Sequence, residues 1–167
     1  MTITAFTERL KTLDVGQIAF DILDRHKDEL VDVQKSQLWA GRDLKGETLT
    51  PKILDDPYFK GNSRWARWWA DRKQEQTQRD DNPAFGIRPY GVANLIFSTG
   101  RIVWNPIRVF PLGTNDLRIG TEFSIQKELE QKYGDLFGLN PQCVDFVIRT
   151  FFREEFLAAV RKHLFES

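Results

Sequence analysis

The two histidines and the single cysteine are the side chains best suited to nucleophilic or metal chemistry. His26 lies on an apolar helical stripe, and His163 lies near the C-terminus, where a cation suits the helix dipole. Cys143 follows a predicted helix start, which favours the thiolate. None of the three has a partner at the spacing of a metal site or a catalytic dyad. We therefore expect structural roles for all of them.

Adjacent acidic residues are the remaining candidates for chemistry. Asp55–Asp56, Asp80–Asp81 and Glu154–Glu155 would suit the metal of a hydrolase, but neighbouring acids in turns are usually solvated. The chain has no phosphate-binding loop and no GxGxxG sequence. The FSTG segment at 97–100 lacks the GxSxG elbow of a serine hydrolase. The sequence predicts no enzyme, no cofactor and no bound metal, and a metal-dependent hydrolase is the weakest alternative.

Three tryptophans share a predicted helix over 63–76. Trp65, Trp68 and Trp69 recur at i, i+3 and i+4, so they lie on one face. The first interpretation is a helix that packs this face into the core. The second is an exposed aromatic patch for a protein partner. The third is a nucleic-acid-binding module, which needs rings and cations on one face, and here we expect them to diverge.

Charge and composition bound the class of protein. The 167 residues carry 24 cations and 24 anions, and the most basic stretch, 61–90, has six cations against four anions. Binding driven by phosphate contacts usually needs a stronger positive excess. A single cysteine excludes an internal disulfide. We recognise no secretion signal and no segment long and apolar enough to span a membrane, so we expect a protein made in the cytoplasm.

The helices and loops that position the candidate residues are predicted from the spacing of apolar residues and from glycines and prolines that end helices. Helical spacing predicts a short helix over 4–12 and a long one over 14–40, capped by Asp14 with Gln17 in a capping box. Residues 1–13 are a possible arm. Long loops are expected over 41–62, pinned by Tyr58 and Phe59, and over 77–91.

Residues 92–120 hold short alternating runs typical of strands, with Pro106 at a break or an edge and a hairpin connection at 111–116. A helix from Ser124 to Gly134 follows, and then a last helix or bent pair that begins with Asn140 and Pro141. Its apolar stripe, from Val144 to Leu164, is expected to be buried against something large. The order of elements predicts a single α+β domain over 1–167, with helices packed on a small antiparallel sheet or hairpin.

Two long segments carry a family resemblance. VANLIFSTGRIVWNPIRV, followed by NDLRIGTEFSIQKELEQKYGDLFGLNP, resembles small proteins encoded in prophages and phages of Bacteroidetes-type hosts. The N-terminal and central helical segments follow in the same order, so the likeness covers about residues 28–165. The chain departs from the family pattern in FSTGR and in its tryptophan-rich central helix. The resemblance extends to tail-completion and head–tail connector proteins.

The resemblance implies a phage structural protein of the neck or tail, assembled in the host cytoplasm and kept in the virion. It would act as a ring or other homo-oligomer and bind other neck or tail proteins, with no membrane partner and with DNA contact only if it lines a channel. The alternative is the nucleic-acid-binding module on the helix 63–76. The candidate interface residues are Trp65, Trp68, Trp69, Trp104, Phe110, Gly113, Asn115 and Asp116.

Overall fold

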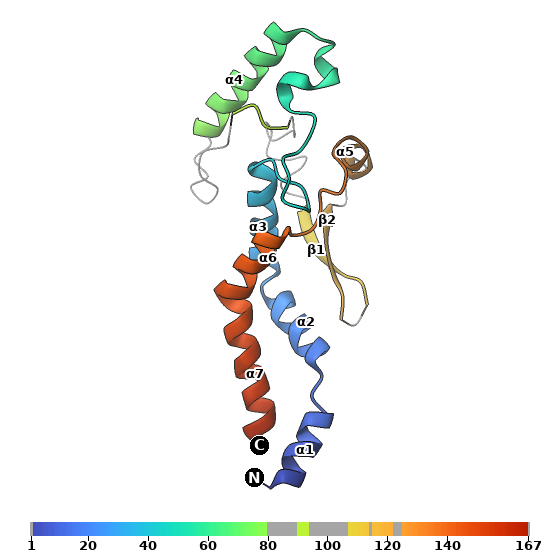
Figure 1. Cartoon of the computed structure of the whole chain (residues 1–167), viewed down its shortest axis with the longest axis vertical. Coiled ribbons are helices and arrows are strands. Elements are labelled where there is room, and N and C mark those ends of the chain that lie inside the picture. The colour runs from blue at the N-terminus through green and yellow to red at the C-terminus, as the bar shows by residue number, and fades with distance from the viewer. Residues whose placement is uncertain (1, 80–89, 94–106, 114, 122–124, 167) are drawn as a thin grey trace.

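The computed structural model describes residues 2–79, 90–93, 107–113, 115–121 and 125–166. The molecule is elongated, with the helix α4 at one end, both termini at the other, and a small sheet beside the middle (Figure 1). Its helices are α1 (Ile3–Lys11), α2 (Val15–Arg25), α3 (Lys27–Trp39), α4 (Ser63–Arg79), α5 (Ile125–Tyr133), α6 (Pro141–Val147) and α7 (Arg153–Phe165). Two antiparallel strands, β1 (Ile107–Pro111) and β2 (Leu117–Thr121), complete an α+β fold, as the sequence predicts.

The predicted single helix over 14–40 is wrong, because the chain breaks at His26. That residue, with φ −100° and ψ 25°, both ends α2 and precedes α3. Asp14 caps α2 as expected and accepts a hydrogen bond from the Gln17 backbone N–H at 2.9 Å. The Gln17 side chain does not close the capping box, since it donates to Asp21 instead.

The hairpin pairs Val109 with Ile119 and places the turn between Pro111 and Leu117, as the sequence predicts. The backbone N–H of Leu112 donates to the Asp116 carbonyl at 2.8 Å and closes the turn. The predicted break at Pro106 lies outside the described residues.

The main core lies where α3, the hairpin and α5 meet. It buries eight residues: Leu38, Trp39, Leu49, Ala93, Ile107, Leu129, Tyr133 and Leu136. The segment 41–62 contributes to this core and contains two 3-10 helices, η1 (Ile53–Asp55) and η2 (Pro57–Phe59), so it is more ordered than the predicted loop. Phe59 anchors it as expected, whereas Tyr58 is exposed.

Two buried glutamines of α3 hold the segment that follows α5. The Gln34 amide donates to the Leu136 carbonyl at 3.1 Å and accepts from the Gly138 N–H at 2.7 Å. Gln37 likewise accepts from the Asn140 N–H at 2.8 Å. These bonds satisfy backbone groups that would otherwise be buried without partners. They fix the place at which Asn140 caps α6 and starts the C-terminal helices.

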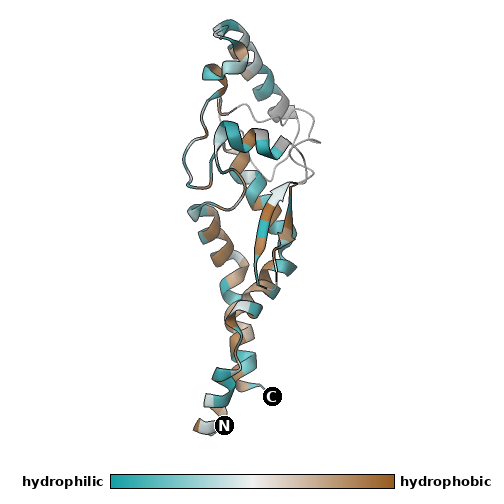
Figure 2. Ribbon diagram, turned by 90° about the vertical axis from the view of Figure 1, so that its right-hand side faces the viewer, coloured by the Kyte–Doolittle hydropathy of each residue, from teal (hydrophilic) through white to brown (hydrophobic). Residues whose placement is uncertain are grey.

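The C-terminal helices form a bent pair, as expected, joined by the π-helical turn η3 (Ile148–Phe152). The apolar stripe predicted to be buried is covered only in part. Val147 and Leu164 are buried, while Val144 and Ile148 are more than two-fifths exposed. Figure 2 shows apolar residues gathered in the middle of the molecule and along the helices that run to the termini, while the end with α4 is largely hydrophilic or neutral.

Candidate protein-interaction surface

Helix α4 buries a different face from the one that the tryptophans mark. Asn62 caps the helix by accepting from the Trp65 N–H at 3.0 Å. Ala66 and Ala70, one turn apart, are buried, and they pack with Ile53 and Phe59. Because alanine is small, the helix approaches η1 and η2 closely along this narrow line. The prediction that all three tryptophans face the core is therefore wrong.

Trp65 and Trp68 lie on the same side of the helix, away from the buried line, and are 40% and 50% exposed. Trp69 is half-buried and packs against the alanine cluster. The Trp65 ring lies 5.0 Å from Phe59, edge to face, and 5.5 Å from the exposed Tyr58. Tyr58, Trp65 and Trp68 together form what we call the aromatic patch. Large, stiff rings left half in water are typical of surfaces that bind a partner.

One cation lies closer to the aromatic patch than the sequence predicted. The Arg72 guanidinium carbon lies 5.5 Å from the centre of the Trp68 ring, within the range of a cation–π contact. Arg64 and Arg67 are exposed, and the structure gives neither an ion pair among the residues that it describes. Arg72 and Trp68 therefore share one surface, so the expected divergence of rings and cations does not hold for this pair.

The other candidate interface residues lie on or near the hairpin. Phe110 is half-buried in β1, opposite Arg118. Gly113, Asn115 and Asp116 are exposed in the turn. A Cβ atom built on Gly16 would lie 3.0 Å from the Asn115 amide nitrogen, so this turn rests on the first turn of α2. Trp104 lies outside the described residues. The structure thus separates the hairpin tip from the aromatic patch, which α4 carries at one end of the molecule (Figure 1).

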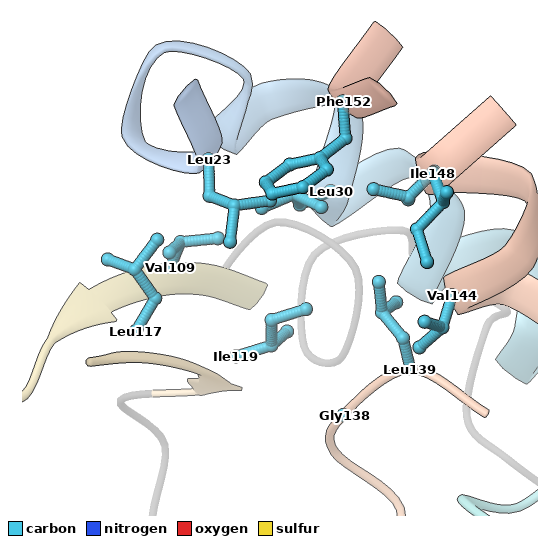
Figure 3. Close-up of a pocket in the computed structure, with 11 residues that line it drawn as sticks. Leu23, Leu30, Val109, Leu117, Ile119, Gly138, Leu139, Val144, Ile148 and Phe152 are labelled. Carbon is cyan, nitrogen blue, oxygen red and sulfur yellow. The ribbon is translucent and has the colours of Figure 1, made fainter. Parts of the chain in front are cut away.

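An apolar pocket of about 390 Å³ opens between the hairpin and the helices α2, α3 and α6 (Figure 3). Its side chains come from both strands, from α2, α3 and α6, from the segment before α6 and from the π turn. They are Leu23, Leu30, Val109, Leu117, Ile119, Gly138, Leu139, Val144, Val147, Ile148 and Phe152. None of these side chains is polar, so no side chain of this lining would orient a polar substrate.

His26 stands three residues from Leu23 of the pocket lining and lies between two carboxylates. Its Nε2 lies 2.6 Å from Glu155 of α7 and its Nδ1 lies 3.2 Å from Glu29 of α3. The hydrogen bond to Glu155 raises the pKa of His26 above its ordinary value, against the opposing effect of burial. The same bond lowers the pKa of Glu155. The arrangement is an ion-pair cluster that joins two helices.

The remaining chemistry-bearing residues also occupy structural positions. His163 lies 3.0 Å from the Arg9 carbonyl and ties α7 to α1. Burial raises the pKa of the Cys143 thiol, contrary to the expected effect of the helix start. Asp56 is buried and binds the Lys132 ammonium at 2.7 Å, so it is not a solvated turn residue. Among the described residues, no three histidine, cysteine or acidic side chains gather as metal ligands would.

Sequence reasoning missed the residues that hold this architecture together. Gln34, Gln37 and Asp56 are polar, and sequence alone suggests solvent exposure for such residues. The one available signal was the position of both glutamines on the apolar side of a predicted helix. The alanines at 66 and 70 gave a second signal, since a pair of small residues one turn apart permits a close helix contact.

No protein-family model matches this chain, and neither does a curated protein or a solved structure. In the described part of the chain, none of the helices combines the length and the apolar character needed to cross a bilayer.

Proposed function

We propose that this chain is a non-enzymatic structural protein that works by association with copies of itself and with other proteins. The observation that carries the proposal is the aromatic patch, where Trp65 and Trp68 are 40% and 50% exposed at one end of the molecule. Tryptophan contributes strongly to binding when a partner removes it from water. The exposed residues Val144 and Ile148 of the C-terminal stripe support the same role.

Within this role, the neck or tail of a phage particle is the setting that the sequence resemblance supports. The subunit would assemble in the host cytoplasm and remain in the virion, as a ring or another closed homo-oligomer. Contacts between unlike surfaces of identical subunits generate rings when the rotation closes. An elongated subunit with its aromatic patch at one end and exposed apolar residues elsewhere offers such unlike surfaces.

Sedimentation velocity over a wide concentration range tests the association. We expect the purified chain to form a defined oligomer, and the double variant Trp65→Ala/Trp68→Ala to shift it towards monomer. Ile3→Ala is the matched control, because Ile3 is an apolar residue exposed on α1, at the other end of the molecule. A chain that stays monomeric at every concentration, or a double variant that assembles like the wild type, contradicts self-association through this patch.

Electron microscopy of the purified oligomer and mass spectrometry of purified phage particles test the proposed role in the phage neck or tail. Closed rings, and the chain in particles at a fixed copy number, are the expected results. Particles without the chain contradict a virion role even if the oligomer forms.

A second candidate function is binding of single-stranded nucleic acid, which the position of Arg72 over Trp68 favours. Exposed rings stack on bases, and nearby arginines contact phosphates. Affinity for a single-stranded oligonucleotide would then fall steeply with salt. Arg64→Ala/Arg67→Ala would weaken binding, while Arg149→Ala, an exposed arginine of the π turn, would not. Affinity that does not respond to salt or to the α4 arginines rules this candidate out.

A further inference from the structure

His26, at the elbow between α2 and α3, contacts both the π turn and α7. The His26 ring stacks on Phe151 of the π turn, with the ring centres 4.0 Å apart. Its two nitrogens contact Glu155 of α7 and Glu29 of α3. Since His26 is also where the helix breaks, these contacts fix the angle between α2 and α3.

A doubly protonated ring would satisfy both carboxylates in this geometry. A neutral imidazole carries one N–H, so it donates to one carboxylate and turns a lone pair towards the other. Only the imidazolium donates to Glu155 and to Glu29 at once. Losing one proton therefore removes one of the two bonds and the charge that strengthens both.

The charged groups that face His26 come from each of the helices around it. Glu29 belongs to α3 and Glu155 to α7. Arg25, the last residue of α2, binds the second Glu155 oxygen at 2.7 Å. In the described residues, only the two glutamates shift the pKa of His26 through charge, and both raise it. Arg25 keeps Glu155 in place when His26 is neutral, so release of the elbow is partial.

The same contacts hold opposite walls of the apolar pocket together. Leu23 and Leu30, which line the pocket, stand three and four residues from His26 along the chain. Ile148 and Phe152, from the π turn, line its other side near Phe151. Figure 3 shows the Phe152 side chain reaching towards Leu23 and Leu30. A loosened elbow would move these walls apart and admit water.

We propose that His26, Glu155 and Glu29 form a proton-dependent latch that closes the α2–α3 elbow onto the π turn, and that deprotonation of His26 opens the apolar pocket. This inference does not depend on the proposed structural role.

The sign of the pH dependence follows from the two shifted groups. The pKa of His26 is raised from 6.5, so its stabilising effect is complete below pH 6.5 and is lost as the pH rises through the raised value. The pKa of Glu155 is lowered from 4.5, so its effect is complete above pH 4.5 and is lost as the pH falls through the lowered value. The latch is therefore complete between these limits and opens on the alkaline side.

Nuclear magnetic resonance of the histidine rings measures the protonation of His26 directly. The chain has only two histidines, so His163→Gln assigns the signals. We expect His26 to titrate above pH 6.5 in the wild type, and Glu155→Gln to lower that midpoint without moving His163. A His26 midpoint at or below 6.5, or one that does not respond to Glu155→Gln, overturns the latch.

Fluorescence of the neutral probe N-phenyl-1-naphthylamine tests the opening, over about pH 6 to 9, the range in which a shifted histidine titrates. In the wild type, emission should rise through the His26 midpoint. In His26→Gln, emission should be high and independent of pH, with circular dichroism confirming the fold. If that variant does not fold, Glu29→Gln replaces it and should shift the rise to lower pH.

His163→Gln is the matched control for the fluorescence test, because His163 contacts a backbone carbonyl and does not lie between acids. It should follow the wild-type curve. A rise that persists unchanged in His26→Gln, or emission that stays flat in the wild type while His26 titrates, overturns the opening.

Discussion

At the scale of single residues, Asp56 joins two distant parts of the chain through one carboxylate. It caps η2 by accepting from the Tyr58 N–H at 3.0 Å. Both of its oxygens also contact the Lys132 ammonium of α5, at 2.8 and 2.7 Å. Burial lowers the pKa of Lys132, but the bond and charge of Asp56, together with Tyr133, outweigh that effect and raise it.

Replacing Asp56 with Asn should therefore destabilise the fold. The amide still caps η2, but it leaves the Lys132 charge without its counter-ion in a partly buried site. We expect a loss of about 2 kcal/mol in the free energy of unfolding, measured by urea denaturation. Asp55→Asn is the control, because Asp55 is exposed, and it should change stability by less than about 0.5 kcal/mol. Equal losses from the two variants would contradict this role of Asp56.

Sequence alone does not distinguish Asp55 from Asp56. The two acids are adjacent and have similar neighbours, and we expected both to be solvated. Asp56 is buried because η1 and η2 turn it towards Lys132, a residue 76 positions away. Local caps such as Asp14 and Asn140 were predictable because both partners lie within a few residues. A partner so far along the chain leaves no local pattern.

At the scale of elements, α4 shows where apolar periodicity gives the wrong face. Its tryptophans are the most conspicuous apolar residues and recur at helical spacing. The buried line is instead set by Ala66 and Ala70, which have almost no side chain to count in such a pattern. The boundaries were more accurate, since the predicted helix 63–76 begins at the observed residue and ends three residues early.

Substitutions on the two faces of α4 should therefore reduce stability by different amounts. Ala70→Leu inserts bulk against Phe59 and Ile53 and should reduce the free energy of unfolding by about 1–3 kcal/mol. Trp68→Ala removes a half-exposed ring and its contact with Arg72, and should cost about 1 kcal/mol or less. Thermal and urea unfolding of both variants provide the measurement. A larger loss from Trp68→Ala would restore the core-facing interpretation of the tryptophans.

The helix break at His26 is a second case at this scale. The spacing from Ile18 to Val33 fits one continuous helix, and no glycine or proline interrupts it. The bend arises from tertiary contacts, because Glu155 and Phe151 hold His26 from the C-terminal helices. By contrast, the two strands of the hairpin and its turn were correctly predicted, since alternation and turn residues are local signals, whereas the predicted strand runs over 94–106 lie outside the described residues.

At the scale of the whole molecule, order should decrease from the sheet towards the termini. The main core lies around α3 and the hairpin, whereas α1 has no buried residue. Helix α1 is held to α7 by the Arg9 guanidinium, which donates to the Leu164 carbonyl at 2.9 Å, and by the contact of Phe6 with Phe165. The α+β class followed from the order of elements, but this elongated arrangement did not, because composition does not define shape.

Hydrogen exchange measures this gradient. We expect the backbone amides of α1 to exchange through local opening at low free energy, and those of α3 near Leu38 to exchange only on global unfolding. Arg9→Ala should speed exchange in α1 further and leave α3 unchanged. Equal protection of the two helices would show that α1 is an integral part of the core.

The π turn between α6 and α7 determines which residues of these two helices lie on the same face. A π turn contains one more residue than the α-helical turn that it replaces, and each α-helical residue advances the helix by about 100°. Residues that share one face of α6 and α7 are therefore spaced one position further apart across the turn than α-helical spacing predicts. Deleting Thr150 should convert the π turn into an α-helical turn and leave α7 facing as it does now relative to α6. The register of α7 against α2 and α1 thus depends on the π turn, because the same residues wound as a continuous α-helix would turn every α7 side chain by about 100° relative to α6.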